Sequence, residues 1–290
     1  MGFGRSARRL SVTLVAVAAL GACGIARDAG RTTANFFNPQ EIPLETYTPE
    51  QIFKRGEFEL NRKRPEDGAF YFAEIERLYP YSEWAKRALI MQAFAYHQDA
   101  DYENSRSAAQ RFIDFYPDDD DAAYAAYLLA LSYYDQIDDV GRDQGLTFQA
   151  LQSLRGVIEG YPDSEYARAS ILKFDLAFDH LAGKEIEIGR YYLRRDHYTA
   201  SINRFRVVVE DFQTTTHTAE ALHRLVEAYL SLGLTDEAQT AGAILGHNYR
   251  STDWYEDSFK LLTGRGLELK SFGDNWLSAI YRQTLKGDWI

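Results

Sequence analysis

Residues Tyr79-Pro80-Tyr81-Ser82-Glu83-Trp84-Ala85 recur as Tyr161-Pro162-Asp163-Ser164-Glu165-Tyr166-Ala167, and this repetition decides the fold. Proline ends a helix, because it lacks an amide donor and disfavours helical backbone in the residue before it. The serine two residues further on can cap the next helix, because its hydroxyl accepts a hydrogen bond from a free amide. Tyr116-Pro117 begins a divergent copy, and Asn248-Tyr249-Arg250-Ser251 looks like a fourth copy without the proline. Each copy therefore predicts a junction between two helices.

A small residue recurs at a regular interval along the chain, upstream of these junctions. Gly56, Ala93 and Ala130 are spaced by 37 residues, and Gly189 and Val226 are again 37 apart. Tetratricopeptide repeats are helical hairpins with a similar period of about 34 residues. No single hairpin can bury its own apolar face, so five such units must stack. We therefore predict an all-α fold, a right-handed α-solenoid of five tetratricopeptide-type helical hairpins; the alternative is a non-repetitive helical bundle.

The fourth unit departs from the simple period, because Ala130 and Gly189 are 59 residues apart. Part of the excess is an acidic, Gly-containing loop at residues 136–145, inside the third hairpin. The remainder predicts a lengthened first helix in the fourth unit, from about residue 165 to residue 195. Apolar residues recur along it at helical spacing and are expected to need cover: Ile171, Phe174, Phe178 and Leu181.

The first 22 residues are predicted to be a signal peptide. Three arginines precede an uncharged run of eleven residues, 10–20, which fits the apolar region of such a peptide and is too short for the roughly 20 residues of a transmembrane helix. Leu20-Gly21-Ala22-Cys23 follows and resembles the lipobox of bacterial lipoproteins, in which the cysteine is acylated and becomes the mature N-terminus. We therefore predict lipidation at Cys23; an ordinary signal peptide with an incidental thiol is the alternative.

The remaining chain divides by composition. Residues 23–46 are predicted to be the lipidated N-terminus and a linker, since they lack helical periodicity; a segment docked on the domain is the alternative. The solenoid is predicted over residues 47–262, with an N-terminal half at 47–163 and a C-terminal half at 164–262. Residues 263–290 form a C-terminal extension. It contains a short amphipathic stretch that is expected to fold back on the solenoid or to contact another subunit, with a weakly ordered terminus as the alternative: Trp276, Leu277, Ile280 and Tyr281.

Composition argues against several functions. The net charge of −11 becomes −14 when the signal peptide is removed, because three arginines and no acid are lost. The absence of a basic patch argues against nucleic acid. No two of the six histidines lie four residues apart, no Gly-rich phosphate loop is present, and Cys23 is the only thiol. We expect no enzyme activity, no cofactor and no metal site; the acidic run at residues 118–121 is expected to cap the following helix rather than to bind calcium.

The mature chain resembles the BamD family, the tetratricopeptide lipoproteins of the outer-membrane β-barrel assembly machinery. The resemblance rests on the lipobox, the five repeats, the long helix of the fourth unit and several short runs, and it covers roughly residues 23–262. The family has a proline where this chain has Arg250, so the backbone geometry at the end of the last hairpin is the one feature that the resemblance does not predict. The matching runs are Leu181-Ala182-Gly183-Lys184-Glu185, Gly189-Arg190-Tyr191-Tyr192-Leu193, Asn203-Arg204-Phe205 and Leu245-Gly246-His247-Asn248-Tyr249.

The resemblance implies a non-catalytic scaffold at the periplasmic face of the outer membrane. Its implied partners are the POTRA domains of the barrel-forming subunit BamA, other lipoproteins of the machinery and unfolded β-barrel proteins. We expect a groove for substrate peptides at Phe53, Glu57, Tyr96 and Tyr133, with inter-repeat packing as the alternative. The POTRA-binding face is expected at Arg204 and Arg206, with solvated helix charges as the alternative. A tetratricopeptide lipoprotein of another envelope process, such as cell-wall synthesis, is the alternative function.

Overall fold

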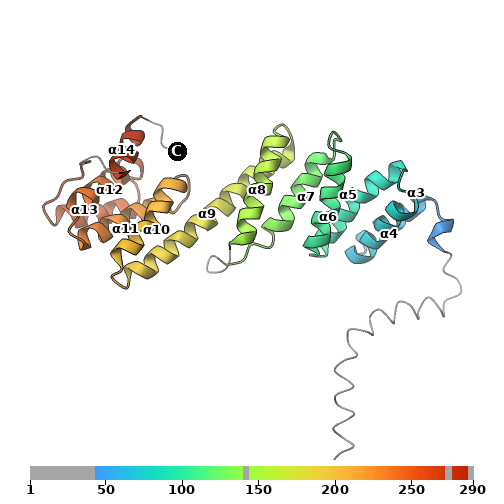
Figure 1. Cartoon of the computed structure of the whole chain (residues 1–290), viewed down its shortest axis with the longest axis horizontal. Coiled ribbons are helices and arrows are strands. Elements are labelled where there is room, and N and C mark those ends of the chain that lie inside the picture. Colours follow the sequence, from blue (N-terminus) through green and yellow to red (C-terminus); the bar gives the residue numbers. More distant parts are fainter. Residues whose placement is uncertain (1–42, 140–143, 272–275, 287–290) are drawn as a thin grey trace, which may run out of the picture.

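The computed structural model describes residues 43–139, 144–271 and 276–286, so Cys23 and most of the predicted linker lie outside the described residues. All regular structure in the described part is helical, and the helices form an elongated stack in chain order (Figure 1). The five predicted hairpins pair the helices from α3 to α12, which confirms the helical repeat fold. The elements are η1 (Leu44–Thr46), α3 (Pro49–Asn61), α4 (Pro65–Leu78), α5 (Glu83–Gln98), α6 (Tyr102–Phe115), α7 (Ala122–Tyr134), α8 (Gly145–Gly160), α9 (Glu165–Leu193), α10 (Tyr198–Asp211), α11 (Thr218–Ser231), α12 (Thr235–Asn248), α13 (Asp253–Thr263) and α14 (Trp276–Lys286).

The junction after each of the five hairpins uses the same turn. The amide of Tyr79 donates to the carbonyl of Ile75 at 2.8 Å, and the carbonyl of Tyr79 accepts from the amide of Ser82 at 3.0 Å. Tyr249 repeats both bonds, with Thr252 as the second donor at 3.1 Å, although Arg250 replaces the proline. The same turn follows Phe212, where the sequence analysis identified no junction. An aromatic residue with a small polar residue three positions later therefore defines this turn, and proline is dispensable.

Side-chain caps fix the start of several helices. The hydroxyls of Ser82, Ser164 and Thr252 accept from backbone amides at the start of α5, α9 and α13, as predicted for the two serines. The acidic run lies directly before α7. Asp121 makes no capping side-chain bond, but Oδ1 of Asp119 accepts from the amide of Asp121 at 3.0 Å, and Oδ2 of Asp119 pairs with Lys86 of α5 at 2.6 Å. This acidic run therefore ties the second hairpin to the turn that leads into the third.

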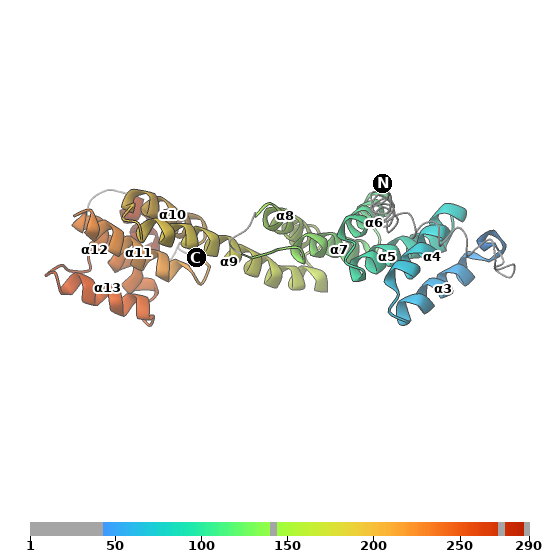
Figure 2. The same cartoon turned by 90° about the horizontal axis from the view of Figure 1, so that it is seen from below.

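The long helix α9 joins two groups of hairpins, and Figure 2 shows it running between them. Ala177 and Leu181 pack with Leu151 of α8, whereas Ala182 and Ile186 belong to the large core formed by α10 to α14. The packing partners of α9 therefore change within the helix, between residues 181 and 182. The expected cover for the apolar residues of α9 is incomplete, because Ile171 stays 45% exposed.

The C-terminal helices close the far end of the stack. Helix α13 packs against α11 and α12, with Leu262 fully buried, and α14 folds back on α12 through Leu277 and Ile280. Of the two expectations for the amphipathic stretch, the structure shows the fold back on the solenoid. No helix in the described ranges has the length and apolar character needed to cross a membrane.

Candidate functional site

A shallow hollow surrounds Arg204, one of the two predicted partner-binding arginines. It measures about 310 Å³ and lies between the end of α9 and the start of α10. The Arg204 guanidinium is half-buried and bonds the carboxylate of Glu185 on α9 at 3.1 Å. This pair holds a cation in the lining of a hollow that also contains apolar side chains. The lining residues are Tyr192, Ala200, Asn203, Arg204 and Val207.

A second hollow of about 450 Å³ adjoins the first, because Tyr192 lines both. Tyr191 is 47% exposed, and the guanidinium of Arg195 stacks over its ring at 3.6 Å. Cations and aromatic rings are therefore concentrated on one surface of an acidic protein, which suits an acidic or aromatic partner. The lining residues are Lys184, Glu187, Ile188, Arg190, Tyr191, Tyr192 and Arg194.

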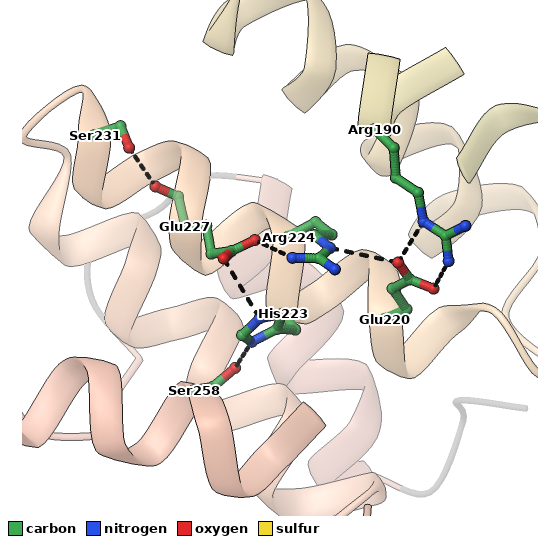
Figure 3. Close-up of polar contacts among 7 residues, drawn as sticks. All are labelled: Arg190, Glu220, His223, Arg224, Glu227, Ser231 and Ser258. Carbon is green, nitrogen blue, oxygen red and sulfur yellow. Dashed lines mark hydrogen bonds and ion pairs between the residues drawn. The ribbon is translucent and has the colours of Figure 1, made fainter. Parts of the chain in front are cut away.

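A buried ion-pair chain supports this surface from behind. Glu220 of α11 is 5% exposed and accepts from both sides of the Arg190 guanidinium, with Nε at 2.7 Å (Figure 3). Arg224 also reaches Glu220, at 3.4 Å, and pairs with Glu227 at 2.6 Å. Burial alone would raise the pKa of Glu220, but the hydrogen bonds and charges of the two arginines outweigh it and hold that pKa below its usual value. The bidentate contact fixes α9 against α11.

The chain of contacts continues to α13 through His223. Its Nδ1 lies 2.8 Å from the hydroxyl of Ser258, and its Nε2 lies 3.7 Å from Glu227 (Figure 3). The ring packs against Trp254, which also receives the Arg224 guanidinium at 5.1 Å. Burial lowers the pKa of His223, so the neutral imidazole is favoured in the folded protein. Three helices are thereby tied together by one polar network.

Arg206, the second predicted partner-binding arginine, is engaged within the chain. It pairs with Glu210 at 2.9 Å, and its guanidinium lies 4.9 Å from the ring of Trp276 on α14. The C-terminal extension therefore contacts the predicted partner surface. Arg204 and Arg206 both belong to α10, but Arg204 lines the first of the two hollows and Arg206 lines neither.

The four residues predicted for a substrate groove do not share one environment. Phe53 is 3% exposed, and its ring lies 5.2 Å from Phe72 and 5.1 Å from Trp84, so it packs between the first two hairpins. Its ring is closed to a peptide in this conformation, as in the packing alternative. Tyr96 and Tyr133 are half-buried, and Arg106 covers Tyr133 at 4.6 Å. Glu57 is exposed.

The polar network of α11 behind the Arg204 surface was not predicted from the sequence. Glu220, His223, Arg224 and Glu227 recur at three- and four-residue intervals, which places them along one side of α11. That pattern is visible in the sequence, but it is equally typical of a solvated helix face. Only the packing of α9 and α13 shows that Glu220 and His223 are buried.

Comparison with known proteins adds an independent observation. Residues 45–244 match the family model YfiO, described as an outer membrane lipoprotein. The chain is 44% identical over 259 residues to the outer membrane protein assembly factor BamD of Caulobacter vibrioides, covering 89% of this chain and 83% of that protein. It is 40% identical to BamD of Rickettsia prowazekii, covering 87% and 96%. A thermophilic TPR protein of Thermus thermophilus aligns over 74% of this chain and all of its own, with 19% identity and a TM-score of 0.36.

Proposed function

Because the chain belongs to the YfiO family of outer membrane lipoproteins and acts in outer membrane protein assembly, as the BamD assembly factors do, we propose that it is a non-catalytic scaffold of that machinery. In this role Cys23 is acylated and holds the protein at the periplasmic face of the outer membrane. The C-terminal hairpins bind the POTRA region of the barrel-forming subunit BamA. Other lipoproteins of the machinery and unfolded β-barrel proteins are further partners.

One observation carries the proposed POTRA contact: Arg204 is held by Glu185 and lines a hollow that adjoins a second one through Tyr192. A pre-oriented guanidinium loses little side-chain entropy on binding, and arginine and tyrosine are the residue types that dominate the energy of interfaces. A carboxylate of a partner can approach Arg204 and compete with Glu185 for it. Because Glu185 is 20% exposed, water can still solvate its carboxylate when Arg204 turns to the partner. We assign Arg204 the central role and Arg206 a lesser one, because Arg204 lines one of the hollows and Arg206 lines neither, although their side chains are similarly exposed, at 42% and 44%.

For the groove that binds unfolded substrates, we propose three of the four predicted residues. Glu57, Tyr96 and Tyr133 keep exposed or half-exposed side chains and remain candidates for contact with an extended peptide. Phe53 contributes through packing, by holding α3 against α4 and α5. Loss of the Phe53 ring would therefore act through stability rather than through direct contact.

The test measures binding of the purified POTRA region of BamA to the protein and to two variants. Arg204→Leu is expected to weaken binding by about thirtyfold, the loss typical of a central interface residue. The control is Arg168→Leu, at an exposed arginine on the other half of α9, which should stay within about twofold. Equal affinities for the two variants would refute the assignment of Arg204. No binding by the unaltered protein would refute the POTRA contact itself and favour a different envelope process.

A further inference from the structure

The first helix of each hairpin carries one of the residues spaced by 37, and the residue two positions after it differs between hairpins. The spaced residues are Gly56, Ala93, Ala130, Gly189 and Val226. In the second, third and fifth hairpins this residue is small and fully buried: Ala95, Ser132 and Ala228. Each lies against the hairpin before it, as the 3.1 Å bond between the hydroxyls of Ser132 and Ser105 on α6 illustrates. In the first and fourth hairpins it is an exposed aromatic, Phe58 at 48% and Tyr191 at 47%. This register position therefore marks the face on which a preceding helix stacks.

The first hairpin lies at the end of the stack (Figure 1), and no described hairpin precedes it to cover this face. Among the described residues only η1 and the residues next to it precede α3, and there Leu44 and Tyr47 pack against the core cluster that contains Ile52 and Phe53. The open stacking face is a connected set of side chains from α3 and α4. The Phe58 ring lies 5.3 Å from the Arg62 guanidinium and 5.6 Å from that of Arg55, and Arg55 reaches Tyr71 at 5.8 Å.

Phe70 extends the same face, because its ring lies 5.5 Å from that of Tyr71 and it is 54% exposed. Terminal hairpins of repeat proteins ordinarily present a polar outer side, since nothing stacks on them. Exposed aromatic rings at a solenoid end are instead typical of an interaction surface. We propose that the open stacking face, formed by Arg55, Phe58, Arg62, Phe70 and Tyr71, binds an acidic amphipathic helix of a partner protein.

Two features of the open stacking face indicate that its partner is a helix and that this helix carries carboxylates. In the second, third and fifth hairpins the equivalent face packs against helices of the preceding hairpin, so its shape suits a helix. The face is also locally basic in a chain of net charge −11. Within residues 54–64 five cations accompany only two acids, and one of these, Glu59, is buried beside Arg55 and Arg64 at 3.6 and 3.5 Å. Arginine next to an aromatic ring favours glutamate and an apolar side chain on the opposing helix.

Other occupants match less well. Residues 24–42 of the same chain contain two arginines and two acids, so they offer no net negative charge, and Gly30 and Pro39 disfavour a helix there. A second copy would bring two basic faces together in a symmetric contact, which charge repulsion opposes.

The test places the photo-reactive residue p-benzoylphenylalanine at position 58 of the full-length protein in the cells that make it. Position 115 is the matched control, because Phe115 is also an exposed helical phenylalanine, 64% exposed, away from this face. We expect an adduct at position 58 to an acidic helical segment of another protein, identified by mass spectrometry. Its yield should exceed that at position 115 by about tenfold and fall about tenfold with Arg62→Glu.

Four outcomes would overturn the proposal. These are an adduct to residues 24–42 of the same chain, an adduct to a second copy, an adduct to lipid, and a yield no higher than at position 115. An Arg62→Glu protein with undiminished yield would overturn the acidic character of the partner. Thermal unfolding of each variant confirms that the exposed substitutions leave the fold intact. The inference rests on the repeat register and does not depend on the proposed POTRA contact.

Discussion

Replacing Gly189 by alanine tests how tightly the fourth hairpin is packed. A methyl group at this position would lie 2.3 Å from Cε1 of Phe205 and 2.7 Å from its Cζ. Carbon atoms in van der Waals contact are about 3.5–4.0 Å apart, so the ring or the helix must move by more than about 1 Å. Phe205 is fully buried between α9 and the helices that follow, which leaves its ring no free space.

Two opposing effects set the magnitude. Alanine stabilises a helix interior by about 1 kcal/mol relative to glycine. Overpacking a filled core costs about 1–3 kcal/mol, and the short distance places this site near the upper end. We therefore expect Gly189→Ala to lower the free energy of unfolding by about 1–2 kcal/mol. Gly156→Ala in α8 is the matched control, because a methyl there meets no atom within 4 Å. It should raise stability by about 0.5–1 kcal/mol.

Urea titration followed by circular dichroism and tryptophan fluorescence measures both variants. Trp254 and Trp276 pack on the C-terminal core and report on the half that contains Gly189. The packing argument fails if Gly189→Ala is as stable as the unaltered protein, or if Gly156→Ala loses as much stability. Unchanged stability of Gly189→Ala would mean that the Phe205 ring can move away from α9 at no cost, contrary to the tight contact between Gly189 and Phe205.

Two further predictions concern single side chains. Ser164→Ala should lower the free energy of unfolding by about 1 kcal/mol, because the Ser164 hydroxyl caps α9. Ser107→Ala, on the exposed side of α6, is the control and should change stability little. Equal urea midpoints for the two variants would contradict the capping role. His223 should make stability depend on pH, because burial lowers its pKa in the folded protein. Below about pH 6.5 the unfolded chain therefore binds a proton that the folded chain does not. The free energy of unfolding is then full above this pH and falls as the pH decreases. Between pH 7.5 and 5.5 a His223→Gln protein should lose less of its melting temperature than the unaltered protein, and parallel losses would refute this role.

The local sequence predicts the helices of this protein well. Helix ends depend on neighbours along the chain, such as Ser164 with the amide of Ala167, and these contacts need no tertiary partner. The 37-residue interval likewise predicts the hairpins, because Gly56 and Gly189 each face an aromatic residue of the following helix. The same local turn explains why Arg250 leaves the last junction unchanged: its two backbone hydrogen bonds form without a proline.

Tertiary structure decides which side of each helix is left to solvent. Phe53 and Phe58 lie five residues apart on α3, and the sequence offers no reason to bury one and expose the other. The burial of Phe53 follows from contact with Phe72 and Trp84, whereas the exposure of Phe58 follows from the lack of a stacked hairpin in the described structure. Glu220 is similar, since only the approach of α9 turns a helix charge into a buried partner for Arg190. The sequence by itself therefore determines the repeating unit, and the stacking of units decides which surfaces remain for binding, because burial depends on what lies opposite.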